Sequence, residues 1–202
     1  MSARTKILSN VAMLWLLAIC GMTRAQSVWP LTKLQELSGE DRITRSNLTQ
    51  EEKTALRSAL NPAFNKFVKE DPTFIPSETF NNLRVRQISL QDHSANSYFV
   101  QPSGYILCGA TGNCPIWIFD HEMHLLLRLN MVQSFVVTDQ SSHGLFDVVV
   151  ASHSSATEHG LRRLRFDGSR YRLIQCANVS NGAFGRTYKK PRFTPESCVG
   201  FN

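Results

Sequence analysis

The sequence predicts an α+β protein that is mainly β, with an antiparallel meander of one or two blade-like sheets, a short helical N-terminal segment and two disulfides. Three observations support this prediction. Short β-type runs follow one another from residue 83 onward and are separated by turn residues. A capped amphipathic stretch precedes them. Four cysteines remain once an N-terminal leader is set aside, an even number typical of disulfide-bonded exported chains.

Residues 1–25 are predicted to be a secretory signal peptide. Basic residues precede a short apolar run over 11–19, and the small residue Ala25 ends the segment, where we expect cleavage. A retained membrane anchor is the first alternative, but the run is too short to span a bilayer unaided and no second run of spanning length follows. A lipoprotein signal at Cys20 is the second, and the bulky Ile19 before it disfavours acylation.

The formal charge is unevenly distributed along the chain. Removing the leader removes three basic residues and no acidic one, so the net charge falls from +6 to +3. From residue 160 onward nine Lys or Arg face two acids, whereas residues 26–159 hold ten against fourteen. A protein or an anionic envelope polymer is the expected partner, and nucleic acid is not. The expected contact residues are Arg162, Arg163, Arg165 and Arg170. An ordinary solvated β surface is the alternative, since apolar residues interrupt these arginines.

Residues 26–82 are predicted to form a helical segment and a linker. Leucines at every third position over 31–37 share one face of a first short helix. Thr49 and Glu52 form a capping box that predicts the start of a second helix. We expect Pro62 to end or kink this helix, with an apolar stripe that continues to residue 70 and packs on the following sheet. A proline-bearing linker then runs to residue 82.

Residues 83–176 are predicted to form an antiparallel β domain. Apolar and polar residues alternate over 83–90, as in a strand with one buried face. The other expected strands are 98–100, 105–107, 116–119, 125–129, 135–137, 146–150, 161–166 and 171–174. The gaps between them are too short for parallel crossovers, so sequential strands should pair antiparallel. Residues 177–202 are expected to be an irregular basic tail tied down by a disulfide.

The cysteine spacing predicts two short covalent loops. Cys108 and Cys114 bracket a glycine-bearing turn between two apolar runs, which indicates a hairpin with a disulfide across its neck. Four cysteines allow three pairings. We favour Cys108 with Cys114 and Cys176 with Cys198, because each pair closes a segment that already reads as a turn or a tail. By chain entropy these loops should stabilise the fold by about 2 and about 3 kcal/mol respectively.

Several motifs resemble known groups of proteins. The segment 107–114, LCGATGNC, followed by Trp117, is similar to small exported bacterial proteins of unassigned function with a CGxxGNC hairpin. The segments 144–150, GLFDVVV, and 166–171, FDGSRY, resemble the β-blade repeats called FG-GAP repeats. This resemblance implies blade-like sheets over about 83–176. Calcium-binding blades carry a loop rich in Asp and Asn, but the corresponding loop at 91–96 offers one carboxylate, so the metal is not expected here.

No cofactor or metal site is predicted. Residues 120–124 read DHEMH, with histidines three positions apart where a zincin helix needs four. A structural zinc set made of Cys108, Cys114, His121 and His124 is the alternative. We favour the disulfide over this zinc set, because exported cysteines are oxidised. No glycine-rich phosphate loop or dinucleotide fingerprint occurs in the sequence.

These observations predict a secreted or periplasmic, non-enzymatic binding protein, and an inhibitor of an envelope hydrolase would be one version. The alternative is a small secreted hydrolase with His143, Asp147 and His153 in its site, since serine, histidine and acid residues gather there. No Gly-x-Ser-x-Gly elbow accompanies them. A third possibility is an assembly module whose exposed sheet edges pair with a partner.

Overall fold

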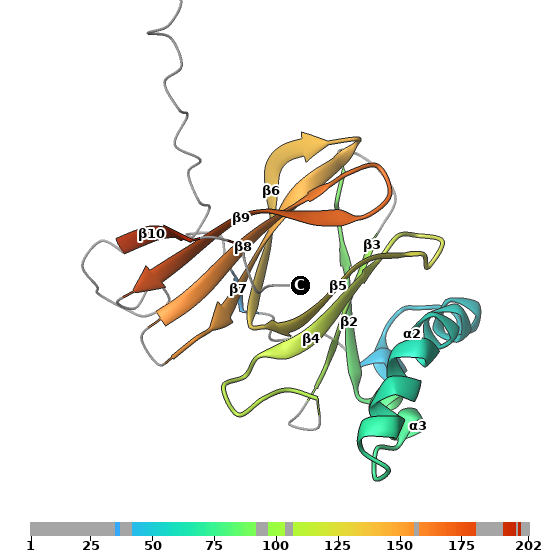
Figure 1. Cartoon of the computed structure of the whole chain (residues 1–202). Helices are drawn as coiled ribbons and strands as arrows, with labels where there is room; N and C mark the ends of the chain where they lie inside the picture. Colours follow the sequence, from blue (N-terminus) through green and yellow to red (C-terminus); the bar gives the residue numbers. More distant parts are fainter. Residues whose placement is uncertain are drawn as a thin grey trace, which may run out of the picture.

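The protein folds into two antiparallel sheets and a helical layer (Figure 1). The computed structural model describes residues 35–36, 42–91, 97–103, 107–155, 158–180, 192–196 and 198. The helices are η2 (Ile43–Arg45), α2 (Gln50–Glu70) and α3 (Pro76–Asn81). The four-stranded sheet has the order β2 (Leu83–Ile88), β3 (Ser97–Pro102), β4 (Cys114–Phe119) and β5 (Leu125–Val132). The six-stranded sheet has the order β1 (Gln35–Glu36), β6 (Ser134–Ser142), β7 (Leu145–His153), β8 (Glu158–Phe166), β9 (Tyr171–Ser180) and β10 (Arg192–Glu196). The predicted mainly β meander with a helical N-terminal segment is confirmed.

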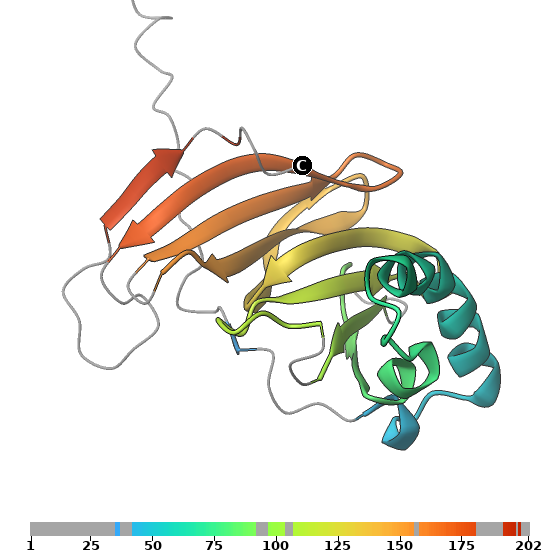
Figure 2. The same ribbon diagram turned by 60° about the horizontal axis from the view of Figure 1, so that its bottom comes forward.

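The four-stranded sheet is the middle of three layers, with the helices on one face and the six-stranded sheet on the other (Figure 2). In the first core, Leu60 and Phe64 of α2 pack with Trp117 of β4. In the second, Ile118 of β4 packs with Val148 of β7. All residues of β3 and β4 are therefore buried. A strand covered on both faces reads as a continuous apolar run, which is the pattern of 116–119.

Helix α2 begins where the sequence predicts and runs through Pro62. Thr49 accepts a hydrogen bond from the Glu52 amide at 3.1 Å, and the Glu52 carboxylate accepts one from the Thr49 amide at 2.7 Å. Of the two outcomes expected at Pro62, an end or a kink, the structure excludes the end, because the helix continues to Glu70. Buried residues on both sides of the proline, Leu60 and Phe64, pack into one core. Tertiary packing thus holds the helix together across the hydrogen bond that proline lacks.

Glu52 also joins the helix to the sheet. The Tyr98 hydroxyl of β3 donates a 2.6 Å hydrogen bond to Glu52 Oε1. This bond, together with that from the Thr49 amide, lowers the pKa of Glu52. Burial and the neighbouring Glu52 carboxylate raise the pKa of Tyr98 to about 12. The folded state therefore favours a charged Glu52 and a neutral Tyr98.

We expect Glu52→Gln to remove part of the pH dependence of stability. The pKa of Glu52 is depressed in the folded protein, so its contribution is present above the unfolded pKa near 4.5 and is lost as the pH falls through the folded pKa. Urea unfolding at several pH values should show the wild type more stable than the variant at pH 7, with the difference shrinking below about pH 5. A difference that stays constant down to about pH 2 would contradict this coupling.

Two predictions for the N-terminal segment need correction. The expected linker contains α3, which starts at Pro76, a position where the missing proline N–H removes no helical hydrogen bond, and buries Phe80 in the first core. The helix expected over 31–37 is a strand where the structure describes it. Gln35 and Glu36 form β1, paired with Phe135 and Ser134 of β6. Pairing with a sheet edge outweighs the local helical periodicity.

The strands of the larger sheet extend beyond their apolar cores. The gap between the expected strands 135–137 and 146–150 shrinks to His143 and Gly144, both at positive φ, as a two-residue hairpin turn requires. The gap between the expected strands 146–150 and 161–166 is likewise shortened, because β7 runs to His153 and β8 starts at Glu158. Polar residues enter these strand ends because an antiparallel sheet tolerates solvent on one face. Hydrophobic periodicity alone therefore underestimates the length of such strands.

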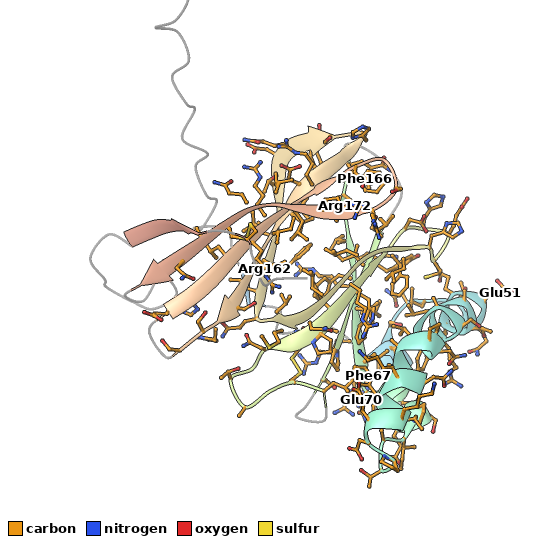
Figure 3. The ribbon with its side chains drawn as sticks, viewed as in Figure 1. Glu51, Phe67, Glu70, Arg162, Phe166 and Arg172 are labelled. Atoms are coloured by element: carbon orange, nitrogen blue, oxygen red, sulfur yellow. A yellow bond between two sulfur atoms is a disulfide. The ribbon has the colours of Figure 1, made fainter. Side chains whose placement is uncertain are left out.

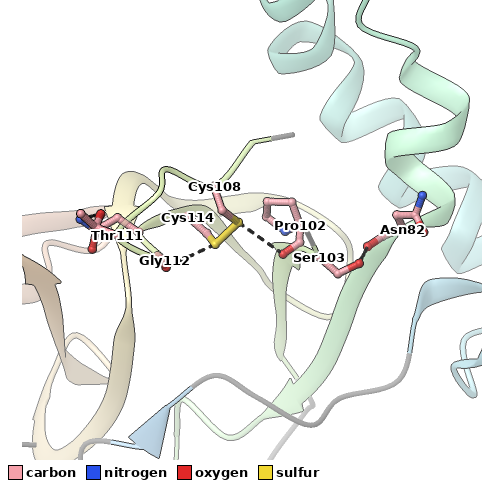
Figure 4. The surroundings of a disulfide bond; sticks show 8 residues. Asn82, Pro102, Ser103, Cys108, Thr111, Gly112 and Cys114 are labelled. Atoms are coloured by element: carbon pink, nitrogen blue, oxygen red, sulfur yellow. Dashed lines mark hydrogen bonds between the residues drawn. A yellow bond between two sulfur atoms is a disulfide. The ribbon is translucent and has the colours of Figure 1, made fainter. Parts of the chain in front are cut away.

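Both predicted disulfides form, Cys108 with Cys114 and Cys176 with Cys198. The hairpin expected around the first pair is partly wrong. Leu107 lies in a turn, residues 105–106 lie outside the described part, and β4 pairs with β3 and β5. The disulfide instead closes the loop that leads into β4 (Figure 4). Within this loop the Gly109 amide donates to the Asn113 carbonyl at 2.8 Å.

The C-terminal segment is more regular than predicted. Strand β9 continues past residue 176 to Ser180, and Arg192–Glu196 pairs with it as β10. Cys176 stands opposite Glu196 in this pairing, two residues from Cys198. The disulfide therefore lies at the end of the β9–β10 ladder.

Some predicted features lie outside the described residues. These are the signal peptide at 1–25 and most of the loop at 91–96. Within the part of the chain that the structure describes, no helix combines the length and apolar character needed to cross a bilayer. 

Candidate functional site

Asp147 is a fully buried carboxylate near the start of β7. Its neighbours Val148 and Val150 face the second core, so strand alternation turns Asp147 toward the opposite face of the sheet. There Arg163 of β8 donates from Nε to Asp147 Oδ2 at 3.0 Å, and its Nη2 lies 2.8 Å from the same oxygen. Arg165 donates to both carboxylate oxygens, at 3.1 and 3.0 Å. Two guanidinium groups thus converge on one carboxylate.

The two arginines of this cluster differ in exposure. The Arg163 side chain is only 6% exposed, and it also donates to Gln140 Oε1. The Arg165 side chain is 44% exposed, and the hydrogen bonds to Asp147 raise its pKa. Arg163 is therefore a structural partner, whereas Arg165 presents part of its charge to solvent.

A second exposed arginine faces Arg165 across the sheet. Arg172 of β9 is its direct antiparallel partner, so both side chains lie on the same face. Like charges at directly opposed positions are destabilising unless other groups offset them. The Arg172 side chain, 52% exposed, donates from Nε to Asp167 Oδ2 at 2.7 Å. Figure 3 shows Arg172 near Phe166 at the end of the β8–β9 hairpin.

Asp167 organises the turn of this hairpin. Its Oδ1 accepts hydrogen bonds from the amides of Ser169 and Arg170, both at 2.9 Å. The Arg172 guanidinium, followed by these amides, holds the pKa of Asp167 well below its usual range. Gly168, at φ 99°, completes the turn with a backbone conformation that favours glycine. The Asp167 carboxylate is thus occupied by contacts within the hairpin turn itself.

We call the set of Arg163, Arg165, Arg170 and Arg172, with Asp147 and Asp167, the arginine hairpin. Four guanidinium groups face two carboxylates, which leaves a local excess of two positive charges. Arg170 is exposed, and its guanidinium has no ion-pair partner among the described residues. The three exposed cations, Arg165, Arg170 and Arg172, can approach an anion without unfolding the site.

Arg162, the fourth arginine expected on a binding surface, lies between the sheets. It stands opposite Val150 on the core-facing side of β8, apart from Phe166 and Arg172 (Figure 3). Its Nη2 donates to the Met131 carbonyl at 3.1 Å and to Ser152 Oγ at 2.8 Å. Burial lowers the pKa of Arg162. Arg162 therefore supports the corner where β5 passes into β6, and it is not available to a large partner.

The three residues of the possible hydrolase site have separate partners. Asp147 binds the two arginines, and His143 Nδ1 lies 2.9 Å from Ser142 Oγ and 3.2 Å from the Phe166 carbonyl. His153 lies six residues beyond Asp147 on an extended strand, which places it about 20 Å away. A nucleophile, base and orienting acid need mutual hydrogen bonds, and these three side chains do not make them.

His153 and His159 form a ring pair where β7 and β8 meet. Their centroids are 4.4 Å apart, and burial followed by the charge of His153 lowers the pKa of His159. The backbone of His153 is fixed by Asn113 from the disulfide loop, which both donates to its carbonyl at 3.0 Å and accepts from its amide at 2.9 Å. These two hydrogen bonds between Asn113 and His153 link the disulfide loop to the larger sheet.

The DHEMH segment forms a turn stabilised by Asp120. Its Oδ1 accepts from the amides of Glu122 and His124, and its Oδ2 lies 3.1 Å from His124 Nδ1. The cysteines of the possible zinc set are bonded to each other. Among the described residues, no three His, Cys, Asp or Glu side chains are grouped so as to hold a metal ion.

Two features of the structure are missing from the sequence prediction. The first is the pairing of Asp147, which the sequence analysis placed only in a possible hydrolase site, with arginines of the next strand. The alternation of Arg163 and Arg165 on one strand face was the available signal. The second feature is a polar groove beside α2, signalled only by the spacing of Lys53 and Arg57.

Comparison with known proteins adds no assignment to these observations. No family model matches the chain, and neither a curated protein nor a solved structure matches it. 

Proposed function

We propose that the protein is exported to the periplasm or the medium and binds an anionic envelope polymer through the arginine hairpin, without catalysing a reaction. The observation that carries this proposal is the opposed pair Arg165 and Arg172, both about half exposed on one sheet face. Arg170 adds a third exposed cation at the same end of the hairpin. A rigid set of guanidinium groups suits the carboxylates or phosphates of a polymer.

The packing supports a role in binding, because the arginines are held in place before any ligand arrives. Arg165 is fixed by two hydrogen bonds to Asp147, and Arg172 by one to Asp167. Side chains that are ordered in advance lose less conformational entropy on association. The export part of the proposal is supported by the leader sequence and by two disulfides in a chain of this size. The FG-GAP likeness stays a prediction.

Retention on immobilised polyanions tests the proposal. The protein, expressed with its own leader and purified from the periplasm of a bacterial host, should be retained on polygalacturonate or polyphosphate and elute with salt. Arg170→Gln/Arg172→Gln should weaken retention about tenfold, because each exposed ion pair is worth up to about 1 kcal/mol. 

A matched control separates a local surface from overall charge. Lys69→Gln/Arg128→Gln removes the same number of charges from exposed positions on α2 and β5. This variant should bind like the wild type. Equal weakening in both double variants would overturn the assignment of binding to the arginine hairpin. If neither the wild type nor the control variant were retained on any polyanion, the proposal of an anionic polymer as partner would be overturned. Binding only to an acidic protein would replace the proposed partner.

A further inference from the structure

A polar groove lies beside the first half of α2, on the helical layer and away from the arginine hairpin. It encloses about 360 Å³ between η2, α2 and α3. The lining residues are Ile43, Thr44, Gln50, Lys53, Thr54, Arg57, Phe80 and Asn81. Ile43 and Phe80 are buried in the first core and form an apolar floor, while hydroxyl, amide and cationic groups surround it. Small-molecule sites commonly combine an apolar floor with a few polar groups in such a volume.

The two cations of the groove are neighbours on the helix. Lys53 and Arg57 are four residues apart on α2, where like charges destabilise a helix. Lys53 also lies near the helix N-terminus, where the backbone dipole disfavours a positive side chain. Among the described residues, neither side chain has an ion-pair partner. Both cations of this groove are therefore without an ion-pair partner within the described structure.

Phe80 fixes the Arg57 guanidinium in position. The guanidinium carbon lies 4.4 Å from the centroid of the Phe80 ring, a cation–π contact. The N–H groups of a guanidinium can match the two oxygens of a carboxylate or a phosphate. Lys53, one helical turn away, can contribute a second charge to the same anion.

We propose that this groove binds a small organic anion of sugar size, whose phosphate or carboxylate group is held by Arg57 and Lys53. The polar body of the ligand would lie against Thr44, Gln50 and Asn81, which supply hydrogen-bonding groups, and above the apolar floor. This site is independent of the arginine hairpin, which lies on the six-stranded sheet.

Isothermal titration calorimetry with four probes tests the site and its ligand chemistry. The probes are glucose 6-phosphate, glucuronate, inorganic phosphate and glucose. We expect glucose 6-phosphate or glucuronate to bind with a dissociation constant of about 1 mM or lower, and glucose not to bind. The better of the two anionic sugars identifies phosphate or carboxylate as the preferred group. Absence of binding by both sugars, or inorganic phosphate binding as tightly as glucose 6-phosphate, would overturn the proposal of an organic anion.

Variants locate the binding. Arg57→Gln and Lys53→Gln should each weaken the preferred sugar about tenfold, the loss expected for one charge-assisted hydrogen bond. Lys66→Gln removes an exposed charge from the same helix outside the groove and should bind like the wild type. Arg170→Gln/Arg172→Gln should also leave this affinity unchanged, which separates the groove from the polymer surface. Unaltered binding in both groove variants would show that the anion binds elsewhere and would overturn the assignment.

Discussion

Replacing Asp147 with Asn should lower the free energy of unfolding by about 3–5 kcal/mol, the usual cost of removing one partner from a buried ion pair. The carboxylate is fully buried and receives every described hydrogen bond that holds Arg165, and it pairs with Arg163 at 2.8 Å. Asn has nearly the same volume, so the loss would report charge and not packing. Urea unfolding followed by circular dichroism measures it.

Two controls distinguish the contributions within this cluster. Arg165→Gln leaves Asp147 paired with Arg163, and since Arg165 is 44% exposed its loss should cost about 1 kcal/mol or less. Asp147→Asn/Arg163→Met removes the buried charge pair together and should recover much of the stability lost by Asp147→Asn alone. A single Asp147→Asn variant as stable as the wild type would show that the ion pairs do not support the sheet.

Trp117→Ala should be destabilising to a similar degree, by about 3–5 kcal/mol. Trp117 is 1% exposed and lies between α2 and the four-stranded sheet, with its ring edge-to-face to Phe64 at 6.5 Å between centroids. Its removal would leave a cavity at the layer boundary and would deprive Phe64 of an aromatic contact. The change in urea midpoint, with an unchanged slope, gives the size of the effect.

Trp117→Phe is the informative companion to this variant. The indole Nε1 is buried and has no hydrogen-bond partner among the described residues. Phenylalanine loses contact area but removes this unsatisfied donor, so the two effects oppose each other. We expect a cost of about 1–2 kcal/mol, well below that of alanine. Equal costs for the two variants would mean that ring contact with Phe64 contributes little.

Local signals in the sequence were sufficient for the elements with strong periodicity or specific end residues. Thr49 and Glu52 located the start of α2, because a capping box needs only residues three apart. The short spacing of Cys108 and Cys114 selected their pairing. The helix end expected as one outcome at Pro62 does not occur, and only the core beneath Leu60 and Phe64 explains why the helix continues. Strand ends such as 138–142 were missed because polar residues enter a strand when its neighbours supply the hydrogen bonds.

The candidate site required knowledge of which face each strand residue occupies. The sequence identified a cluster of arginines, but it did not separate Arg162 from Arg163 and Arg165. Register and sheet packing turn Arg162 toward the core and the other two toward Asp147, because adjacent strand residues point to opposite faces. The groove at Lys53 and Arg57 likewise depends on η2 and α3 folding back against α2.

The sequence by itself determined the antiparallel β architecture, the capped helix and the two disulfides, because short gaps between strands, a capping box and cysteines that bracket a turn or a tail can be read from spacing along the chain. Tertiary structure alone decided that the strands divide into two sheets at the β5–β6 corner, that the middle sheet is covered on both faces, and which charges remain exposed. These depend on contacts between residues far apart in sequence, and a local pattern does not encode which distant partner satisfies a buried group.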